Sequence, residues 1–249
     1  MMNKISFVAS PLTNPSILSW RSIESIACSP VLVVAPHPDD ETLGCGGAIA
    51  LLRSLKCDVQ VLVISDGTLS HPNSLKYPAP ALLALRESET LLALQLLDVG
   101  VNAISFYRMQ DGSITAQYKS AVANCRAYLT KVAPQIIFLP WRYDPHPDHR
   151  ATWKLIHTAL ENLGLSPRLI EYPIWDWDLE QRGNVPESLG VTTWRLNIGA
   201  VVELKQQAIA AYRSQITDLI DDDPEGFRLS AEMLANFTHP WEVYIEENR

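Results

Sequence analysis

Two short segments of the chain combine histidine with aspartate at spacings that suit a metal ion. The first is Pro36–Glu41 (PHPDDE) and the second is Asp144–His149 (DPHPDH). A catalytic zinc ion takes three protein ligands from histidine and carboxylate side chains and keeps one position open for water. His37 and Asp40 lie three residues apart in the first segment, and His149 offers a third ligand from the second. The two segments therefore predict a metal site.

The remaining polar residues of these segments suit hydrolysis of an acyl bond. A bound metal ion lowers the pKa of its water ligand to about 7, and Asp39 is able to take the proton of that water as a general base. His146 suits two roles, stabilising the oxyanion or protonating the leaving amine. Asp148 is able to fix the tautomer of His146. Zinc is the expected metal, and iron(II) also suits two histidines and one aspartate.

Each segment alone also fits an ordinary turn, because aspartate caps helices and proline is common in turns. The position of both segments favours the metal site instead. Each follows a predicted buried strand and precedes a predicted helix, which places the two segments at the same edge of one sheet.

The elements that position these segments alternate between strand and helix. Short runs of apolar, β-branched residues predict strands buried on both faces, and the segments between them have helical periodicity. A spacing of roughly 30 residues implies right-handed βαβ units. The sequence therefore predicts an α/β fold, a Rossmann-like, mostly parallel sheet flanked by helices. The predicted strands are 31–35, 59–64, 103–107, 135–139 and 168–174, and the predicted helices are 42–55, 80–97, 116–132 and 148–163.

The rest of the chain has a weaker pattern. We expect a single domain over residues 1–249, with an N-terminal extension (1–29), an α/β core (30–175) and a C-terminal substrate-loop and helical part (176–249). Within these parts the sequence predicts a short helix around 17–26, an aromatic loop over 175–190, a strand over 193–198, a helix over 202–215, a second helix over 225–236 capped by the turn at 221–224, and an edge strand over 241–245.

Composition excludes several classes of protein. Acidic residues outnumber basic ones, 28 to 20, for a formal charge of −8, and no basic run offers a nucleic-acid surface. The four cysteines form no CxxC pair, which predicts free thiols in a reducing compartment. No stretch is long enough for a membrane span, and the apolar N-terminal stretch is too short for a signal peptide. We expect a cytoplasmic protein, and its oligomeric state stays open.

The quoted segments resemble the PIG-L / LmbE-like family of zinc-dependent de-N-acetylases. The resemblance covers about Val31 to Ser214, and smaller pieces support it at Arg86-Glu87, at Asp111 with its neighbours, and at Tyr212–Gln215. It implies a hydrolase that removes the N-acetyl group from an N-acetylglucosamine-like conjugate, a small molecule.

The resemblance also implies a role for individual residues. His37, Asp40 and His149 would bind zinc, and Asp39 would be the general base. His146 would stabilise the tetrahedral intermediate and Asp148 would orient it. Arg86 and Asp111 would contact the sugar. The substrate loops vary in this family, so the natural substrate, the acyl group and the aglycone stay open.

Aromatic residues near the two segments in sequence have two interpretations. Trp141, Tyr143, Trp175 and Trp177 are able to stack on sugar rings or to fill the core. The role of the loop Trp175–Asp178 is open for the same reason. The other three histidines, His71, His157 and His239, have no partner motif, and we expect them to be structural or on the surface.

Three other functions compete with N-deacetylation. The first is a zinc amidase of the same fold with another amide substrate. The second is a metal-dependent sugar or nucleotide transferase that holds its ion at Asp39-Asp40 or at Asp221–Asp223, although carboxylate-only sites leave the histidines unexplained. The third is a non-catalytic sugar-binding protein, which the complete set of catalytic residue types disfavours.

Overall fold

Strand β3 (Val31–Ala35) lies in the interior of an eight-stranded sheet, and all five of its residues are buried. Val31 and Val33 face one core, and Leu32 and Val34 face the other. A strand covered on both faces needs a continuous apolar run, which is what the sequence has here. The computed structural model describes residues 7–8, 12, 14–116, 118–178, 180, 182, 185–186 and 190–248.

The sheet has the order β2-β9-β10-β7-β6-β3-β4-β5. The five strands β7, β6, β3, β4 and β5 are parallel to one another. β10 is antiparallel to both β7 and β9, and β2 is parallel to β9. The bounds are β2 Ser19–Arg21, β4 Val59–Ser65, β5 Ile104–Met109, β6 Ile136–Pro140, β7 Arg168–Tyr172, β9 Val191–Asn197 and β10 Trp241–Glu247. A separate antiparallel pair joins β1 (Phe7–Val8) to β8 (Val185–Pro186).

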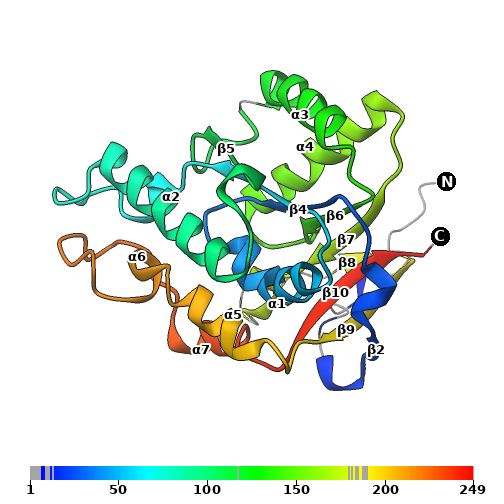
Figure 1. The fold of residues 1–249 in the computed structure, drawn as a ribbon. Helices are drawn as coiled ribbons and strands as arrows, with labels where there is room; N and C mark the ends of the chain where they lie inside the picture. Colours follow the sequence, from blue (N-terminus) through cyan, green and yellow to red (C-terminus); the bar gives the residue numbers. More distant parts are fainter. Residues whose placement is uncertain are drawn as a thin grey trace.

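Helices cover both faces of the sheet (Figure 1). Helices α1, α2 and α5 enclose one apolar core with the sheet, and α3 and α4 enclose the other. The α/β prediction of a mostly parallel sheet flanked by helices is confirmed. The helices are α1 Asp40–Ser54, α2 Ala79–Leu96, α3 Tyr118–Val132, α4 Pro147–Leu163, α5 Val202–Ile209, α6 Arg213–Ile216 and α7 Ala231–Ala235, with 3₁₀ turns at 15–17, 23–26, 68–70, 101–103 and 175–177. None of the described helices is both long and apolar enough to cross a membrane.

The two histidine segments follow neighbouring strands at the point where the strand order reverses. From β3 the chain builds outward through β4 to β5, then returns to the other side of β3 and continues through β6 to β7. The loops after β3 and β6 therefore leave the sheet in opposite directions. In open α/β sheets the crevice at such a switch point is where ligands bind.

Glycine permits a close approach beneath this crevice. A Cβ atom added to Gly44, in the first turns of α1, would lie 2.3 Å from Cδ2 of Tyr172. The Tyr172 hydroxyl donates a 2.7 Å hydrogen bond to the carbonyl of Val34. The ring thus fills the space between α1 and the ends of β3 and β7, and it holds the start of α1 at a fixed height above the sheet.

Two helix predictions in the terminal parts were wrong. Residues 17–26 form β2 and a 3₁₀ turn instead of a helix, because β2 pairs with β9 and the carbonyl of Leu18 accepts hydrogen bonds from Arg195. The predicted helix 202–215 is broken into α5 and α6. The break at 210–212 turns Tyr212 and Ser214 toward two buried carboxylates, Glu41 and Glu89.

Two further predictions at the C-terminal part were wrong. The predicted helix 225–236 is reduced to α7, because Asp222 and Asp223 accept hydrogen bonds from backbone N–H groups of the distant segment 73–76 and do not cap a helix. The predicted edge strand is the interior strand β10. Tertiary contacts outweigh local pattern in both cases.

Candidate metal centre and active-site pocket

The loop after β3 has an unusual backbone at the residue predicted to be the base. Asp39 has φ = 131°, a region that favours glycine and stores strain in other residues. Its carbonyl accepts the N–H groups of Thr42 and Leu43, the first turn of α1. Helix α1 thus fixes the strained residue, and such strain is concentrated at functional sites.

Asp40 brings the two histidine segments together. Its Oδ2 atom lies 3.2 Å from Nδ1 of His37 and 3.2 Å from Nε2 of His149. Burial alone would raise the pKa of Asp40, but the charges and hydrogen bonds of His149 and His37 lower it well below its ordinary value. Asp40 is therefore an ionised carboxylate between two imidazole rings.

His149 has a carboxylate on each side. It is fully buried, with Asp40 at Nε2 and Oδ2 of Asp144 lying 3.3 Å from Nδ1. Burial lowers the pKa of His149, but Asp144 and Asp40 outweigh this effect and raise it to about 9. The two carboxylates therefore favour a positive charge at this ring. Among the described residues, neither ring nitrogen has a partner in hydrogen-bond geometry.

His37, Asp40 and His149 are donors of the types that a metal ion such as zinc accepts. With Zn–N and Zn–O bonds of about 2.0–2.1 Å, the ligand atoms of a tetrahedral site lie about 3.3 Å apart, close to the spacing of Asp40 from both histidines. Asp144 has the place of the carboxylate that typically orients a metal-bound histidine. Two groups of three described side chains offer ligand atoms within 4.8 Å of one another, His37/His146/His149 and His37/Asp111/Asp148. The first group shares His37 and His149 with the predicted set but has His146 in place of Asp40, which is in neither group.

Asp39 is ion-paired with Arg86 inside the protein. Nη2 of Arg86 lies 3.1 Å from Oδ2 of Asp39 and donates to the carbonyl of Pro38, and Nη1 donates to the carbonyl of Gly67. Burial raises the pKa of Asp39 to about 8, although the charge of Arg86 lowers it, and Asp40 also contributes to the increase. A carboxylate with a pKa in this range suits a general base near neutral pH.

His146 caps helix α4. Its Nδ1 atom accepts a 3.2 Å hydrogen bond from the backbone N–H of Asp148, so the proton of the neutral ring lies on Nε2. Burial and the charges of His37 and His149 lower the pKa of His146 to about 4. The ring is therefore neutral near pH 7 and is a hydrogen-bond donor through Nε2.

Asp111 and Asp148 both contact His37. Oδ1 of Asp111 lies 3.2 Å from Nε2 of His37, and Oδ2 of Asp148 lies 3.5 Å from it. The Asp148 carboxylate also accepts the N–H of Gly112. Asp148 contacts the His146 ring through its backbone N–H, whereas its carboxylate lies beside His37. This position suits the carboxylate to orient His37.

A pocket of about 470 Å³ collects these residues. We call it the active-site pocket, and all of the predicted site residues except Asp148 and His149 line it, with His149 buried beneath. An adjoining cavity of about 840 Å³ shares Trp175, Phe227 and Leu229 with it. The lining residues of the active-site pocket are His37, Asp39, Asp40, Leu43, Leu69, Ser70, Arg86, Asp111, Gly112, His146, Pro147, Ile174, Trp175, Gln215, Phe227 and Leu229.

The aromatic residues divide between core and pocket. Trp141 is fully buried in a small apolar cluster, and Tyr143 packs on it. Trp175 lies in the pocket wall, where its ring stacks on His146 with 6.1 Å between centroids. Trp177 lines the adjoining cavity but not the active-site pocket. Because Trp175 borders both the active-site pocket and the adjoining cavity, the loop 175–178 forms a partition between them.

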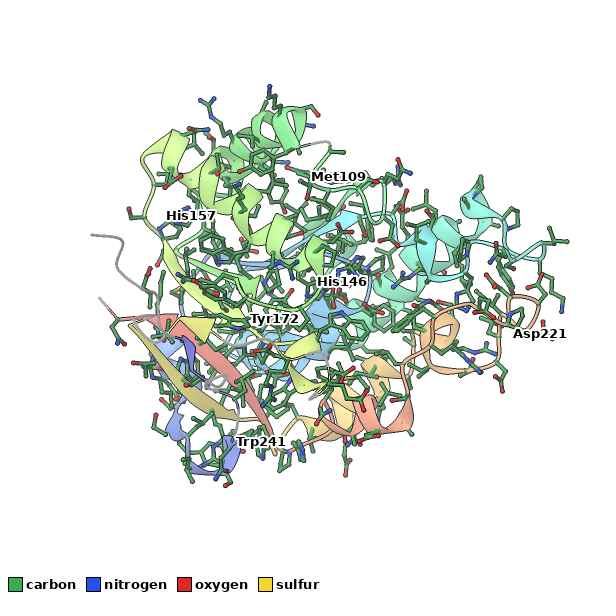
Figure 2. All side chains as sticks on the ribbon, turned by 180° about the vertical axis from the view of Figure 1, so that it is seen from behind. Met109, His146, His157, Tyr172, Asp221 and Trp241 are labelled. Atoms are coloured by element: carbon green, nitrogen blue, oxygen red, sulfur yellow. The ribbon has the colours of Figure 1, made fainter. Side chains whose placement is uncertain are left out.

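The acidic run 221–223 lies away from the histidines. Figure 2 shows Asp221 at the edge of the molecule, in a loop remote from His146. Asp222 binds N–H groups of Leu75 and Lys76, and Asp221 is ion-paired with Lys76. This run stabilises a loop, and this position disfavours the transferase hypothesis that placed an ion there.

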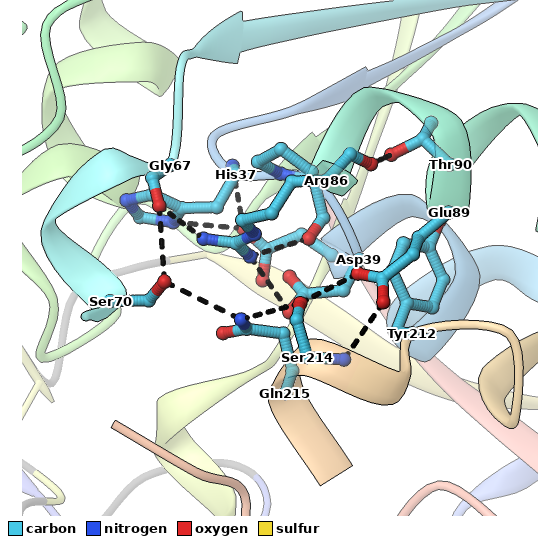
Figure 3. A network of polar contacts seen from close by, with 12 residues as sticks. His37, Asp39, Gly67, Ser70, Arg86, Glu89, Thr90, Tyr212, Ser214 and Gln215 are labelled. Carbon is cyan, nitrogen blue, oxygen red and sulfur yellow. Dashed lines mark hydrogen bonds and ion pairs between the residues drawn. The ribbon is translucent and has the colours of Figure 1, made fainter. Parts of the chain in front are cut away.

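A second layer of polar contacts holds the pocket wall (Figure 3). The Tyr212 hydroxyl donates to the Glu41 carboxylate, which accounts for Glu41 on the first turn of α1. Glu89 accepts hydrogen bonds from the backbone and the hydroxyl of Ser214 at 2.8 and 2.6 Å. The next residue, Gln215, lines the pocket. Arg86 forms its salt bridge with Asp39 and not with Glu87 or Glu89, and Glu87 pairs with Arg108.

Sequence reasoning missed two residues of this site. Asp144 opens the second histidine segment, and its position five residues before His149, in the same short loop, is the signal in the sequence that points to it. Gln215 belongs to the segment Tyr212–Gln215, which supports the family resemblance. Its place in the pocket follows only from the fold. His71, His157 and His239 lie outside the predicted metal centre: His71 is buried, His157 stacks on Trp153, and His239 stacks on Trp241.

Comparison with known proteins supports the same chemistry. Residues 32–160 match the family described as PIG-L: GlcNAc-PI de-N-acetylase. A probable N-acetyl-alpha-D-glucosaminyl L-malate deacetylase 2 of Bacillus subtilis (strain 168) is 27% identical over 214 residues, which cover 83% of this chain and 92% of the relative.

Solved structures are similar in fold. N,N'-diacetylchitobiose deacetylase from Pyrococcus horikoshii, complexed with an inhibitor, has a TM-score of 0.58 and 26% identity, covering 78% of this chain and 73% of that chain. A zinc-inhibited form of teicoplanin deacetylase has a TM-score of 0.63 over 88% of this chain and 98% of that chain. At 18% identity, the second likeness concerns the fold alone.

Proposed function

The chain belongs to the PIG-L family of GlcNAc-PI de-N-acetylases, and from this membership we propose that it is a zinc-dependent hydrolase of the N-acetyl group of an N-acetylglucosamine-like conjugate. Members of this family are deacetylases, hydrolases that act on amide bonds. The observation that carries the metal-dependent mechanism is the position of Asp40, 3.2 Å from both His37 and His149, in the pocket that Asp39 and His146 also line.

His37, Asp40 and His149 are the proposed zinc ligands. Asp40 is preferred to His146 as the third ligand because its ionised oxygen lies between the two histidine rings. Nδ1 of His146 is already an acceptor for the N–H of Asp148. Asp144 and the pair Asp111/Asp148 orient His149 and His37 from behind.

The protein's own groups then perform the proton transfers. When bound, the metal supplies an activated water molecule and a Lewis acid for the acyl oxygen. Asp39 takes the proton of the attacking water on its carboxylate and delivers it to the amine nitrogen that leaves, with Arg86 fixing the carboxylate. The Nε2–H group of neutral His146 donates to the developing oxyanion. Water and the amide are thus converted to acetate and a free amine.

The walls of the pocket favour a substrate that is larger than one sugar. The active-site pocket and the adjoining cavity share the wall residues Trp175, Phe227 and Leu229. A conjugate whose amide lies at the metal is therefore able to extend past these residues into the adjoining cavity. The names of similar proteins specify an N-acetyl-glucosaminyl malate and a diacetylchitobiose as substrates. An amino-sugar conjugate of that size fits the combined space.

The test is a screen of N-acetylated amino sugars and their glycosides for acetate release. We expect activity that a chelator abolishes and that added zinc restores, with anaerobic iron(II) as a parallel reconstitution. Release of a larger carboxylic acid in place of acetate would identify an amidase of the same family. Chelator-resistant acetate release would rule out the metal-dependent mechanism.

A further inference from the structure

Gln215, on the short helix α6, is a buried side chain with one unused polar atom. It is fully buried and lines the active-site pocket together with Asp39 and Arg86. Its Nε2 atom donates to Oγ of Ser214 at 2.9 Å and lies 3.4 Å from Oγ of Ser70. Within the described part of the chain, its Oε1 atom has no hydrogen-bond partner.

The surrounding network fixes which atom of the Gln215 amide is the nitrogen and which is the oxygen. The hydroxyl of Ser214 donates its one proton to the Glu89 carboxylate, and the hydroxyl of Ser70 donates to the carbonyl of Gly67. Both hydroxyls are therefore left as acceptors. Oγ of Ser70 also lies 3.3 Å from Nδ1 of His71, but Oγ of Ser214 has the NH₂ group of Gln215 as its donor. The assignment of nitrogen and oxygen in this amide thus follows from its neighbours.

Figure 3 shows the consequence: the amide nitrogen of Gln215 bridges Ser70 and Ser214. The carbonyl oxygen is left as an obligate acceptor. A buried acceptor without a donor is unfavourable, so a ligand that fills the pocket binds best when it brings a donor to this point.

We propose that Gln215 is a substrate-binding residue whose carbonyl oxygen accepts a hydrogen bond from one hydroxyl group of the amino-sugar ring. This inference rests on the proposed function. A hydroxyl is the expected donor because the other donor of an N-acetylated sugar, the scissile amide N–H, lies on the reacting nitrogen, to which Asp39 delivers its proton. Ser214 and Glu89 are positioning residues, since they act on the substrate only through Gln215.

The experiment compares the best amino-sugar substrate of the screen with its monodeoxy analogues. In the wild-type enzyme, removal of one particular hydroxyl should lower kcat/KM about tenfold or more, because the buried oxygen is then unpaired. In Gln215→Met, the parent substrate should lose a similar factor, and the parent and that analogue should react at equal rates. Gln207→Met, at an exposed position on α5, is the matched control and should discriminate as the wild type does.

Metal content and Tm of each variant separate this role from a structural one. Where Gln215→Met lowers either, Ser214→Ala gives a second test: it removes the acceptor that holds the amide, so it should weaken discrimination against the same analogue. A metal-loaded Gln215→Met enzyme that still discriminates as the wild type does against every monodeoxy analogue overturns the inference alone. A wild-type enzyme that deacylates no amino sugar instead overturns the proposed function, and this inference with it.

Discussion

Oδ2 of Asp144 lies 3.3 Å from Nδ1 of His149 and also accepts the backbone N–H of Trp175 at 3.1 Å. One carboxylate oxygen therefore connects a proposed zinc ligand to the loop that divides the two cavities. Oδ1 of the same residue accepts the N–H of His146. Asp144 thus fixes the start of α4, the metal-binding ring and the aromatic partition relative to one another.

The first prediction concerns the charge of Asp144. Asp144→Asn keeps the shape of the side chain but weakens the electrostatic support of His149, and we expect zinc affinity to fall about 10- to 100-fold. Competition with a chromophoric chelator measures this change. Asp98→Asn, at an exposed position, serves as the control, and equal zinc affinity in the wild type and Asp144→Asn would remove Asp144 from the metal centre.

The second prediction separates the two candidate ligand sets. His149→Ala should lose its zinc, whereas His146→Ala should keep a full equivalent and lose about 10²- to 10³-fold in kcat, the usual effect of removing one oxyanion donor. Elemental analysis and steady-state kinetics on both variants give the answer. Loss of zinc from His146→Ala would favour the alternative set, in which His146 is a ligand.

The third prediction concerns the general base. Asp39→Ala should retain zinc, because Asp39 is not a proposed ligand, and should lose at least about 10²- to 10⁴-fold in turnover. Acetate release is measured beside metal content. Substantial activity in a zinc-loaded Asp39→Ala enzyme would falsify the base assignment.

The fourth prediction follows from the pair Arg86–Asp39. The positive charge of Arg86 lowers the pKa of Asp39, so Arg86→Met should raise that pKa, and the base is then ionised only at higher pH. The acidic limb of the kcat/KM profile should move upward by about one pH unit or more. Arg86→Lys, which keeps the charge, should move it less. An unchanged pH profile with a raised KM would indicate instead that Arg86 contacts the sugar.

The sequence was sufficient to predict the core of the fold and the meeting of the two histidine segments. Val31–Ala35 is a continuous apolar run, which is typical of a strand buried on both faces. Because this strand is a neighbour of β6 inside the parallel sheet, the loops after β3 and β6 lie together. His37, Asp40 and His149 meet for this reason. Their roles as ligands stay predictions that the second experiment tests.

The missed features depend on contacts between distant parts of the chain. Asp222 and Asp223 have the residue type of a helix cap, but they bind the segment 73–76, about 150 residues earlier. Gln215 enters the pocket only because Glu89 holds Ser214. Local periodicity carries no information about such partners, which is why α5 and α6 read as one helix in the sequence.

The fifth prediction concerns acid stability at a position away from the pocket. Burial raises the pKa of Glu246, but the bidentate pairing with Arg168, at 2.7 and 2.9 Å, and the charge of Arg21 outweigh it and lower the pKa. This stabilisation is fully present above the unfolded-state pKa of about 4.3 and is lost as the pH falls through the folded-state value.

Glu246→Gln should therefore lower the free energy of unfolding by about 1 kcal/mol at pH 7, in the range of partly exposed ion pairs. The difference from the wild type should vanish below the folded-state pKa. Urea unfolding at a series of pH values, with equal metal loading, measures it. A difference that stays constant down to the lowest pH would show that the carboxylate charge is not the cause.

The place of β10 has a consequence for how the protein is made. β10 fills the gap between β7 and β9, and its Glu242 accepts the N–H groups of Gly47 and Ala48 in α1. Of the described strands, it is the last to leave the ribosome. Until it does, the nascent chain carries two open strand edges, which are sites for wrong pairing with other chains. The parallel core is able to assemble first, but the sheet closes only after translation has passed residue 247, so a pause before β10 emerges prolongs the aggregation-prone stage.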